Sequence, residues 1–533
     1  MIKNPIIPGF NPDPCICRKN DDYYLAVSSF EWMPGIPVYH SRDLAHWELY
    51  TNILTDEKTL NLKGLPSAKG IWAPCLTWND TDGLFYLVYG VMNSTNARYF
   101  DIDNFLITAP DIKGPWSEPV YIHSAGFDAS MFHDDDGKKY IVALEWETRS
   151  GYEQPGKIDL VEFDIENKRC TGFPRRIWGG ATDRGCLEAP HITKRNGYYY
   201  LMCAEGGTGY NHCVSMARAK NIYGPYEADP NGPIVTANPY PNYERNQPDH
   251  LKPQYYNPKS ELQKCGHGSY VDLPNGETYL FHLCSRPFVP ELRCTLGRET
   301  AIQKMKWTED GWLRMADGSN LAKVLVEEPK LPEFAATELP ACDNFDSDVL
   351  RADYYAPRQM PSNFINLDRK GTLRIRGGES PSSLYNVSLL CRKLQSLDST
   401  ITANSTEANS GAAGALAGVV KDGSTISNVL VSNSSVGTTT SKAKNSDISG
   451  DSAGGLIGAI DGKSSSADAD TVKVEGCAAT SVSVTTSISD TEPPTADDTI
   501  GVAGGLIGTT KGKTSVTYSY CSSFESSTET NES

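Results

Sequence analysis

A short pattern of polar turn residues followed by aromatic and aliphatic residues recurs five times between Asn20 and His282. Four copies carry Asp-Gly or Asn-Gly, which accept the positive φ angles of a tight hairpin turn, and the residues that follow favour strands. In every copy a tyrosine stands four residues after the first turn residue. The five segments are NDDYYLAV, DGLFYLVY, DGKKYIVA, NGYYYLMC and NGETYLFH, with the tyrosines Tyr24, Tyr86, Tyr140, Tyr200 and Tyr279. The pattern predicts five β-hairpins of one kind.

The spacing of these hairpins indicates the fold class. The tyrosines are 62, 54, 60 and 79 residues apart. The segments SRDLAHW, APDIKGPW and AKNIYGPY follow three of the hairpins and are typical of a turn and an outer strand. Units with several short strands and almost no helical pattern predict an all-β fold, a β-propeller with five blades. A β-sandwich is the alternative, although it does not require five matching units.

The strand before each hairpin turn is expected to line the central channel of such a propeller. Twelve residues before the repeated tyrosine stand Pro74, Asp128, Glu188 and His267, and in the first copy Asp13 stands eleven residues before it. Three carboxylates that point into one channel repel one another and lose hydration. The alternative role of these three acidic residues is to cap strands or turns. At matched positions they indicate a site that needs carboxyl groups of different pKa.

Charge and composition limit the classes of partner that the chain is expected to bind. The chain has 533 residues, 49 of them basic and 66 acidic, which gives a formal net charge of −17 and argues against nucleic acid and anionic membranes as partners. Neither a run of eighteen apolar residues nor an apolar N-terminal leader occurs, so a cytoplasmic location is expected. The fourteen cysteines stand singly except Cys15 and Cys17, without zinc-type spacing, and we expect reduced, mostly buried thiols.

The chain changes character after Arg392, because no Arg, His or Trp follows it and Ser, Thr, Ala, Gly and Asp dominate. Three copies of a glycine-rich segment, GAAGALAG, DSAGGLIG and GVAGGLIG, align Gly414, Gly454 and Gly504. They resemble the Gly-Leu-rich repeats of bacterial surface proteins, which stack as β-solenoid turns. A disordered Ser/Thr-rich tail is the alternative. Either a natural fusion or an artefact that joins the sequences of two genes would explain the change in composition. The repeats also make a cell-surface location the alternative to the cytoplasmic one.

Seven further segments occur in order before residue 326. They are PGFNPDP, SSFEWMPGIPVYHSRDLAHWEL, GIWAPCLTW, GFDASMFHDDDGKKY, CLEAPHITKRNGYYYL, GHGSYVDLPNGETYLFHLCSRP and LGRETAIQKMKW. Together they resemble motifs of glycoside hydrolase family 43, and within it of the β-xylosidases. The family implies a five-bladed propeller, in agreement with the repeats. This chain differs from the family motifs at two positions. Cys15 stands where the family often has serine, and Cys75 stands where it often has a polar residue.

The resemblance implies an inverting glycosidase with three catalytic carboxyls. Asp13 would be the general base that activates water, and Glu188 the general acid that protonates the leaving oxygen. Asp128 would tune the pKa of Glu188 and orient its side chain. Inversion requires a base and an acid roughly 6.5–9.5 Å apart, which leaves room for the water. A carboxylate close to the acid raises the pKa of the acid by repulsion between like charges.

The resemblance also implies four substrate-binding residues. Arg298 corresponds to an arginine that contacts the bound sugar, with a salt bridge to Glu299 as the alternative. Phe30 and Trp72 correspond to aromatic walls of the pocket, where rings stack on the C–H faces of sugars, with packing in the core as the alternative. His267 corresponds to the channel histidine, which in some relatives orders water around a central calcium. The alternative role of His267 is that of a buried core histidine. No cofactor is expected for this chain, with a central calcium near His267 as the alternative.

The expected function is an exo-acting enzyme that releases terminal β-1,4-xylosyl residues from xylo-oligosaccharides. An α-L-arabinofuranosidase or an enzyme with both activities is the alternative, and an inactive carbohydrate-binding or adhesive protein is the alternative of another class. A homo-oligomer is left open. The predicted domains are a propeller over 1–325, a linker with a partial β-sandwich over 326–397, and a repeat tail over 398–533. The middle segment resembles the opening of the β-sandwich of these β-xylosidases.

Overall fold

The computed structural model describes residues 1–95, 100–146, 156–239 and 251–396, and beyond these the backbone of the strands β28 to β41. The chain forms two compact units, Met1–Gln395 and Ser396–Ser533. In the described part the regular elements are strands, apart from the 3-10 turns η1 (Pro253–Tyr255) and η2 (Pro361–Asn363). None of its helical elements has the length and apolar character needed to cross a membrane.

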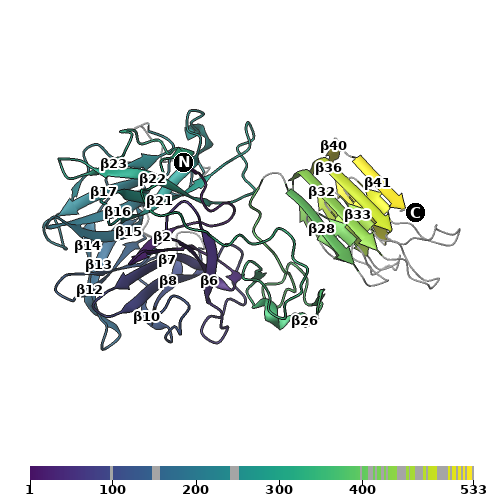
Figure 1. Cartoon of the computed structure of the whole chain (residues 1–533), viewed down its shortest axis with the longest axis horizontal. Helices are drawn as coiled ribbons and strands as arrows, with labels where there is room; N and C mark the ends of the chain where they lie inside the picture. Colours follow the sequence, from purple (N-terminus) through teal and green to yellow (C-terminus); the bar gives the residue numbers. More distant parts are fainter. Residues whose placement is uncertain are drawn as a thin grey trace. The chain divides into compact units, whose positions relative to one another are not determined.

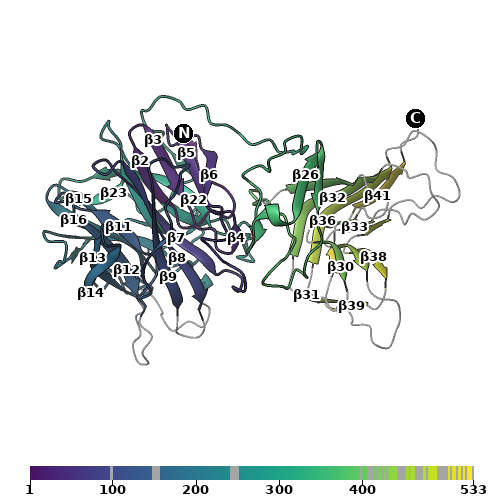
Figure 2. The same ribbon diagram turned by 90° about the horizontal axis from the view of Figure 1, so that it is seen from below.

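Five antiparallel sheets form the blades of a propeller, which confirms the predicted fold (Figure 1, Figure 2). The first strands of the blades contact one another and therefore line the centre, and the later strands follow outward in chain order. The strands are β2 (Cys15–Lys19), β3 (Asp22–Ala26), β5 (Gly35–Ser41) and β6 (Glu48–Leu54); β7 (Gly70–Asn79), β8 (Leu84–Ser94), β9 (Asp101–Ala109) and β10 (Val120–His123); β11 (Ser130–His133), β12 (Lys139–Glu145), β13 (Lys157–Asp164) and β14 (Arg169–Trp178); β15 (Glu188–Arg195), β16 (Tyr198–Glu205), β17 (Cys213–Ala219), β18 (Glu227–Ala228) and β19 (Val235–Thr236), which pairs with β17; and β20 (Gln263–Asp272), β21 (Thr278–Ser285), β22 (Glu299–Trp307) and β23 (Leu313–Met315).

The five repeated tyrosines stand on the second strand of each blade and are all buried. In the fourth blade the hairpin turn has Asn196 at φ 50 and Gly197 at φ 73, the two positive φ angles that match the twist of the flanking strands. Each turn therefore pairs the channel strand with the strand that carries the tyrosine, and the five predicted hairpins are confirmed.

Apolar contacts between neighbouring blades form the core. Val38 and Leu87 join the first and second blades, and Met202 and Leu280 join the fourth and fifth. All four side chains are almost fully buried, and each such burial contributes about 1.5–3 kcal/mol to stability. The sheets are thereby held face to face around the channel.

The N-terminal segment closes the propeller on its last blade. Strand β1 (Ile2–Lys3) pairs with β24 (Leu325–Val326). The Asn4 side chain donates to the carbonyl of Ile302 on β22 at 2.7 Å and accepts its amide hydrogen at 2.9 Å. The chain then enters the first blade beside the fifth, which brings Asp13 next to the residues that precede β22.

The segment after the propeller packs back on the first blade. Strand β25 (Ala356–Pro357) pairs with β4 (Trp32–Met33), and β26 (Ile365–Arg369) forms a hairpin with β27 (Thr372–Ile375). These short strands lie in the same compact unit as the blades. The domain boundary at 325 stays a prediction, while the unit boundary after residue 395 lies close to the predicted start of the tail.

The glycine-rich copies of the tail lie side by side in parallel register. Gly414 pairs with Gly454, and Gly454 pairs with Gly504. Each copy contributes strands to more than one parallel sheet, and the resemblance to the solenoid repeats of surface proteins stays a prediction. The strands are β28 (Ser399–Ser405), β29 (Ala412–Gly414), β30 (Ala417–Lys421), β31 (Thr425–Ser427), β32 (Leu430–Thr440), β33 (Ser452–Gly454), β34 (Ile457–Asp461), β35 (Val472–Glu475), β36 (Ala478–Ile488), β37 (Val502–Gly504), β38 (Ile507–Lys511), β39 (Thr514–Thr517), β40 (Tyr520–Ser522) and β41 (Glu525–Thr530).

Candidate active site

Each blade holds a non-glycine residue with a left-handed backbone four residues before the position that pairs with the repeated tyrosine. These residues are Asp13 (φ 58), Ala73 (φ 41), Asp128 (φ 51), Ala189 (φ 51) and His267 (φ 51). In β7, β15 and β20 the residue falls within a register shift of the sheet, as in a β-bulge. Non-glycine residues adopt this backbone rarely and at a cost in energy. Its fivefold recurrence marks the layer of the channel where candidate chemistry is concentrated.

The equivalent positions differ in two blades from the count of twelve residues. Ala73, not Pro74, is the left-handed residue of the second blade, and Ala189, not Glu188, is that of the fourth. The count fails because the hairpin connections differ in length. In every blade the left-handed residue stands four residues before the residue that pairs with the tyrosine, but that partner stands seven to nine residues before the tyrosine. Glu188 therefore stands one residue before the equivalent position, as the first residue of β15.

Asp13 is a buried carboxylate surrounded by hydrogen-bond donors. Ser28 Oγ donates to its Oδ2 at 2.7 Å, Arg298 Nη1 donates to its Oδ1 at 3.0 Å, and His267 Nδ1 lies 3.6 Å from the same Oδ1. Burial opposes the charge of Asp13, but the Arg298 guanidinium, His267 and the Ser28 hydroxyl together bring its pKa below the ordinary value. Asp13 is therefore held as the charged form.

The pKa values of Asp128 and Glu188 are raised, in contrast to that of Asp13. Burial and then the charge of Asp13 raise the pKa of Asp128 to about 7. Burial, followed by the charges of Asp128 and Asp13, raises the pKa of Glu188 well above its ordinary value. The backbone amide of Ala189 donates to Asp128 Oδ2 at 3.0 Å, which fixes the chain next to Glu188. One channel thus contains an ionised carboxylate from the first blade and a protonated carboxyl from the fourth.

Arg298 belongs to this site and not to the alternative salt bridge. Its guanidinium reaches Asp13, whereas the neighbouring Glu299 is fully buried and binds Arg286 through two contacts of 2.8 and 2.9 Å. Glu299 also accepts the amide hydrogen of Gly9 at 2.8 Å. The alternative pairing of Arg298 with Glu299 is therefore wrong, because the Glu299 carboxylate is already engaged on its other side.

The two predicted wall aromatics lie beside this arginine. The Arg298 guanidinium carbon is 5.2 Å from the centre of the Phe30 ring, and the Phe30 and Trp72 ring centres are 5.7 Å apart. Trp72 is half-buried and donates its Nε1–H to the Ala68 carbonyl at 3.2 Å, while Phe30 is only 5% exposed. Trp72 therefore offers the ring surface, and Phe30 supports it from behind.

His267 lies in the same layer and has a buried neighbour that the sequence did not single out. Burial lowers the pKa of His267 to about 4 and that of His212 to about 3, so both rings are neutral near pH 7. A Cβ at Gly266 would lie 2.4 Å from the His212 ring, so only glycine fits there. In the described residues no group of three His, Cys, Asp or Glu side chains converges on His267, and Ca²⁺ requires six to eight oxygen ligands. The expectation of no cofactor stays a prediction.

Ser28 is the second site residue that sequence reasoning missed. Its hydroxyl accepts the amide hydrogen of Ala73 at 2.7 Å while it donates to Asp13, so it ties the carboxylate of the first blade to the bulge of the second. The segment SSFEW that carries part of the family resemblance contains Ser28. That segment was the available signal, since a lone serine after a strand has no pattern of its own.

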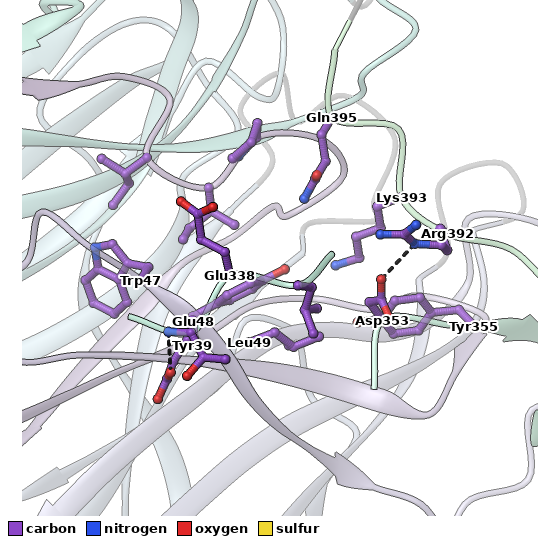
Figure 3. A pocket seen from close by; sticks show the side chains of 15 residues that line it. Tyr39, Trp47, Glu48, Leu49, Glu338, Asp353, Tyr355, Arg392, Lys393 and Gln395 are labelled. Atoms are coloured by element: carbon purple, nitrogen blue, oxygen red, sulfur yellow. Dashed lines mark hydrogen bonds and ion pairs between the residues drawn. The ribbon is translucent and has the colours of Figure 1, made fainter. Parts of the chain in front are cut away.

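A cavity of about 300 Å³ lies away from the three carboxyls, where the segment after the propeller crosses the first blade (Figure 3). Its lining includes Tyr39, Trp47 and Arg392, and Arg392 Nε donates to Asp353 Oδ2 at 2.7 Å. Lys393 also lines this cavity, and burial lowers its pKa to about 7. The cavity thus marks how the later segment is attached to the propeller.

Comparisons with known families cover most of the chain. A family model described as "Glycosyl hydrolases family 43" matches residues 2–313. A second, described as "Beta xylosidase C-terminal Concanavalin A-like domain", matches residues 342–439. The second match runs past residue 397, where the resemblance noted from the sequence ended, and includes the first strands of the tail.

Individual proteins align with the same part of the chain. A Humicola insolens protein named "Xylosidase/arabinosidase 43B" is 41% identical over 74% of this chain and 69% of its own length. A "Beta-xylosidase" of Bacillus subtilis is 40% identical over 74% of this chain and 72% of its own. The crystal structure of a xylan beta-1,4-xylosidase from Bacillus halodurans superposes with a TM-score of 0.68 at 45% identity and covers 74% of this chain and 72% of that one.

Proposed function

Because the chain belongs to glycoside hydrolase family 43, we propose that it hydrolyses terminal β-1,4-xylosyl residues of xylo-oligosaccharides with inversion at the anomeric carbon. The observation that carries this proposal is a pair of carboxyls in one channel, one of them ionised and the other protonated. Asp13 is stabilised as a carboxylate by Arg298 and Ser28, and Glu188 is stabilised as an acid by burial and by its carboxyl neighbours. A single displacement by water requires an ionised base and a protonated acid, far enough apart to admit the water molecule.

Each carboxyl has one role in this mechanism. Asp13 accepts a proton from the attacking water as the oxygen bonds to the anomeric carbon. Glu188 donates its proton to the glycosidic oxygen as the bond to the leaving group breaks, so the leaving group departs as a neutral alcohol. Asp128 keeps the proton on Glu188 through its charge and, by binding the Ala189 amide, holds the backbone beside the acid.

The remaining site residues position the sugar. The Trp72 ring supplies an apolar face for the C–H side of the sugar ring, and Arg298 has further N–H groups for the hydroxyls besides the one that contacts Asp13. His267 is neutral at pH 7 and can donate or accept one hydrogen bond beside the base. These assignments of Arg298, Phe30, Trp72 and His267 to substrate binding belong to the proposal.

The alternative activity is cleavage of α-L-arabinofuranosides. The name of the Humicola insolens relative includes both activities, and nothing in the geometry of the described site favours one sugar over the other. A small-molecule oligosaccharide is the partner of either reaction. The cytoplasmic location and the homo-oligomeric state stay predictions.

A substrate panel tests the proposal. Xylobiose, 4-nitrophenyl β-xyloside and 4-nitrophenyl α-L-arabinofuranoside are incubated with the wild type and with Asp13→Asn, which keeps the shape of the base without its charge. We expect release of xylose from xylobiose by the wild type and its near loss in the variant. Faster cleavage of the arabinofuranoside would favour the alternative activity. Binding of xylobiose without cleavage would favour the inactive carbohydrate-binding protein.

A further inference from the structure

A second set of inward positions lies one step further along the first strands. Two residues after each left-handed residue stand Cys15, Cys75, Ser130, His191 and Ser269. Alternate residues of a strand face the same side, and two residues span about 6.6 Å. This layer therefore lies next to the layer of Asp13, Asp128 and His267 but is separate from it.

The two serines of the layer are engaged with the neighbouring blades. Ser130 Oγ donates to the Pro190 carbonyl at 2.5 Å. Ser269 Oγ donates to the Pro14 carbonyl at 2.9 Å and accepts the amide hydrogen of Ile16 at 3.0 Å. The serines thus fasten the third blade to the fourth and the fifth to the first, and they leave the other three side chains of the layer to face one another.

Those three side chains converge. The Sγ atoms of Cys15 and Cys75 and a ring nitrogen of His191 all lie within 4.8 Å of one another. Both thiols are buried and reduced, and the imidazole is half-buried. Across the part of the chain that the structure describes, this is the one group of three or more His, Cys, Asp or Glu side chains with such spacing.

We propose that Cys15, Cys75 and His191 form a Cys₂His binding site for Zn²⁺ in the centre of the propeller. Thiolate and imidazole are the ligands that Zn²⁺ prefers, with Zn–S distances of about 2.3 Å and Zn–N distances of about 2.0–2.1 Å. In a tetrahedral site these lengths place the ligand atoms roughly 3.5–3.8 Å apart. The ligand atoms lie within 4.8 Å of one another, so small rotations of the three side chains would bring them to this spacing. A water molecule would take the fourth position. The proposal is independent of the proposed hydrolytic function.

A neighbouring backbone group supports one of the ligands. The amide hydrogen of Leu76, next to Cys75 on β7, is donated to Cys15 Sγ at 3.4 Å, and the Cys15 thiol donates to the Leu76 carbonyl at 3.6 Å. The amide contact would remain when the thiol loses its proton, and it orients the ligand sulfur. Binding of Zn²⁺ would release the two thiol protons to solvent. The ion would join the first strands of the first, second and fourth blades.

The composition of the site distinguishes it from a calcium site. Calcium takes oxygen ligands, whereas two sulfurs and a nitrogen select a softer ion. Cys15 and Cys75 are also the two positions at which the chain departs from the family pattern noted above. The site is therefore expected to be a property of this chain rather than a requirement of the hydrolytic chemistry.

Metal content tests the proposal directly. The full chain is purified under reducing conditions, stripped with a chelator, incubated with Zn²⁺ and desalted, and its zinc is measured by elemental mass spectrometry. We expect about one zinc per chain, and a loss of at least about tenfold for Cys15→Ser, Cys75→Ser and His191→Ala. The matched control is Cys17→Ser, a buried cysteine on the same strand as Cys15 but outside the group, which should keep its zinc.

Cobalt supplies a second readout, because Co²⁺ bound to thiolates shows an intense ligand-to-metal charge-transfer band. We expect the band in the Co²⁺-loaded wild type and in Cys17→Ser, weaker in each single cysteine variant and absent when both cysteines are replaced. Circular dichroism checks that the variants are folded, and the wild-type measurement needs no variant. The proposal is overturned if the reduced wild type binds no zinc, if the double variant retains it, or if Cys15 and Cys75 are found joined as a disulfide.

Discussion

Asp13 and Glu188 carry the same functional group, and their surroundings give it different charge states. The Asp13 carboxylate lies beside a guanidinium and a hydroxyl donor, whereas Glu188 faces the charges of two other carboxyls in a buried setting. A lowered pKa and a raised pKa in one channel assign the base and the acid. The assignment makes the two residues respond differently to mutation and to pH.

The leaving group separates the two roles. Asp13→Ala and Glu188→Ala should each reduce kcat with xylobiose by roughly 10²–10⁴-fold, the usual contribution of general acid–base catalysis. With 4-nitrophenyl β-xyloside the Glu188→Ala variant should lose far less, because nitrophenolate needs little protonation, while Asp13→Ala should lose as much as before. Steady-state kinetics on both substrates measure this. Equal losses of the two variants on both substrates would contradict the assignment.

The alkaline limb of the pH profile should report Glu188. The acid must be protonated, so activity is lost as the pH rises through its raised pKa. Asp128→Asn removes a negative charge but keeps the size of the side chain, so the pKa of Glu188 should fall and the alkaline limb of kcat should move to lower pH. The control is Asp135→Asn, an exposed residue of the same blade, which should leave the limb in place. A shift of the limb to higher pH in Asp128→Asn would contradict the role of that residue.

The first strand of each blade and the residues just before it build the site, through a left-handed residue that lies within a bulge in three of the five blades. In the fifth blade this geometry depends on Gly266, because any Cβ there would meet the His212 ring at 2.4 Å. Gly377 provides a comparison, since a Cβ at that position meets no atom within 4 Å and neither glycine has a positive φ.

Gly266→Ala should therefore destabilise the propeller by about 1–3 kcal/mol, the usual cost of overpacking, and reduce activity by displacing His212 and His267. Gly377→Ala should change the free energy of unfolding by less than about 0.5 kcal/mol. Denaturant unfolding and kinetics of both variants provide the measurement. If the two variants unfold alike, the close contact at Gly266 does not matter.

At this scale the sequence predicts the hairpins but not the exact length of each hairpin connection. A hairpin is encoded locally by its turn residues and the alternation that follows, so the five tyrosines could be aligned by counting. The length of each hairpin connection varies, so a fixed count reached Pro74 and Glu188 where Ala73 and Ala189 are equivalent. The hydrogen bonds of Ser28 and the convergence of Cys15, Cys75 and His191 could not be read from spacing, because the partners come from different blades. The family resemblance identified the carboxyls because it compares whole motifs.

For the whole molecule, the described site residues all belong to the unit Met1–Gln395. A chain that ends at residue 396 should therefore keep the kcat/KM of the full chain for xylobiose within about twofold, as expected for distant, independent parts. The two proteins are compared by kinetics at equal concentrations of folded protein. A tenfold loss would mean that the tail contributes to catalysis or to substrate binding.

The central claim is a single displacement in which water activated by Asp13 attacks the face opposite the group protonated by Glu188. Proton NMR of the first product released from 4-nitrophenyl β-xyloside, recorded before mutarotation, tests it most directly. Inversion predicts that α-xylose appears first and that its β-anomer grows in later. Early β-xylose would mean retention through a covalent intermediate and would contradict the roles given to both carboxyls.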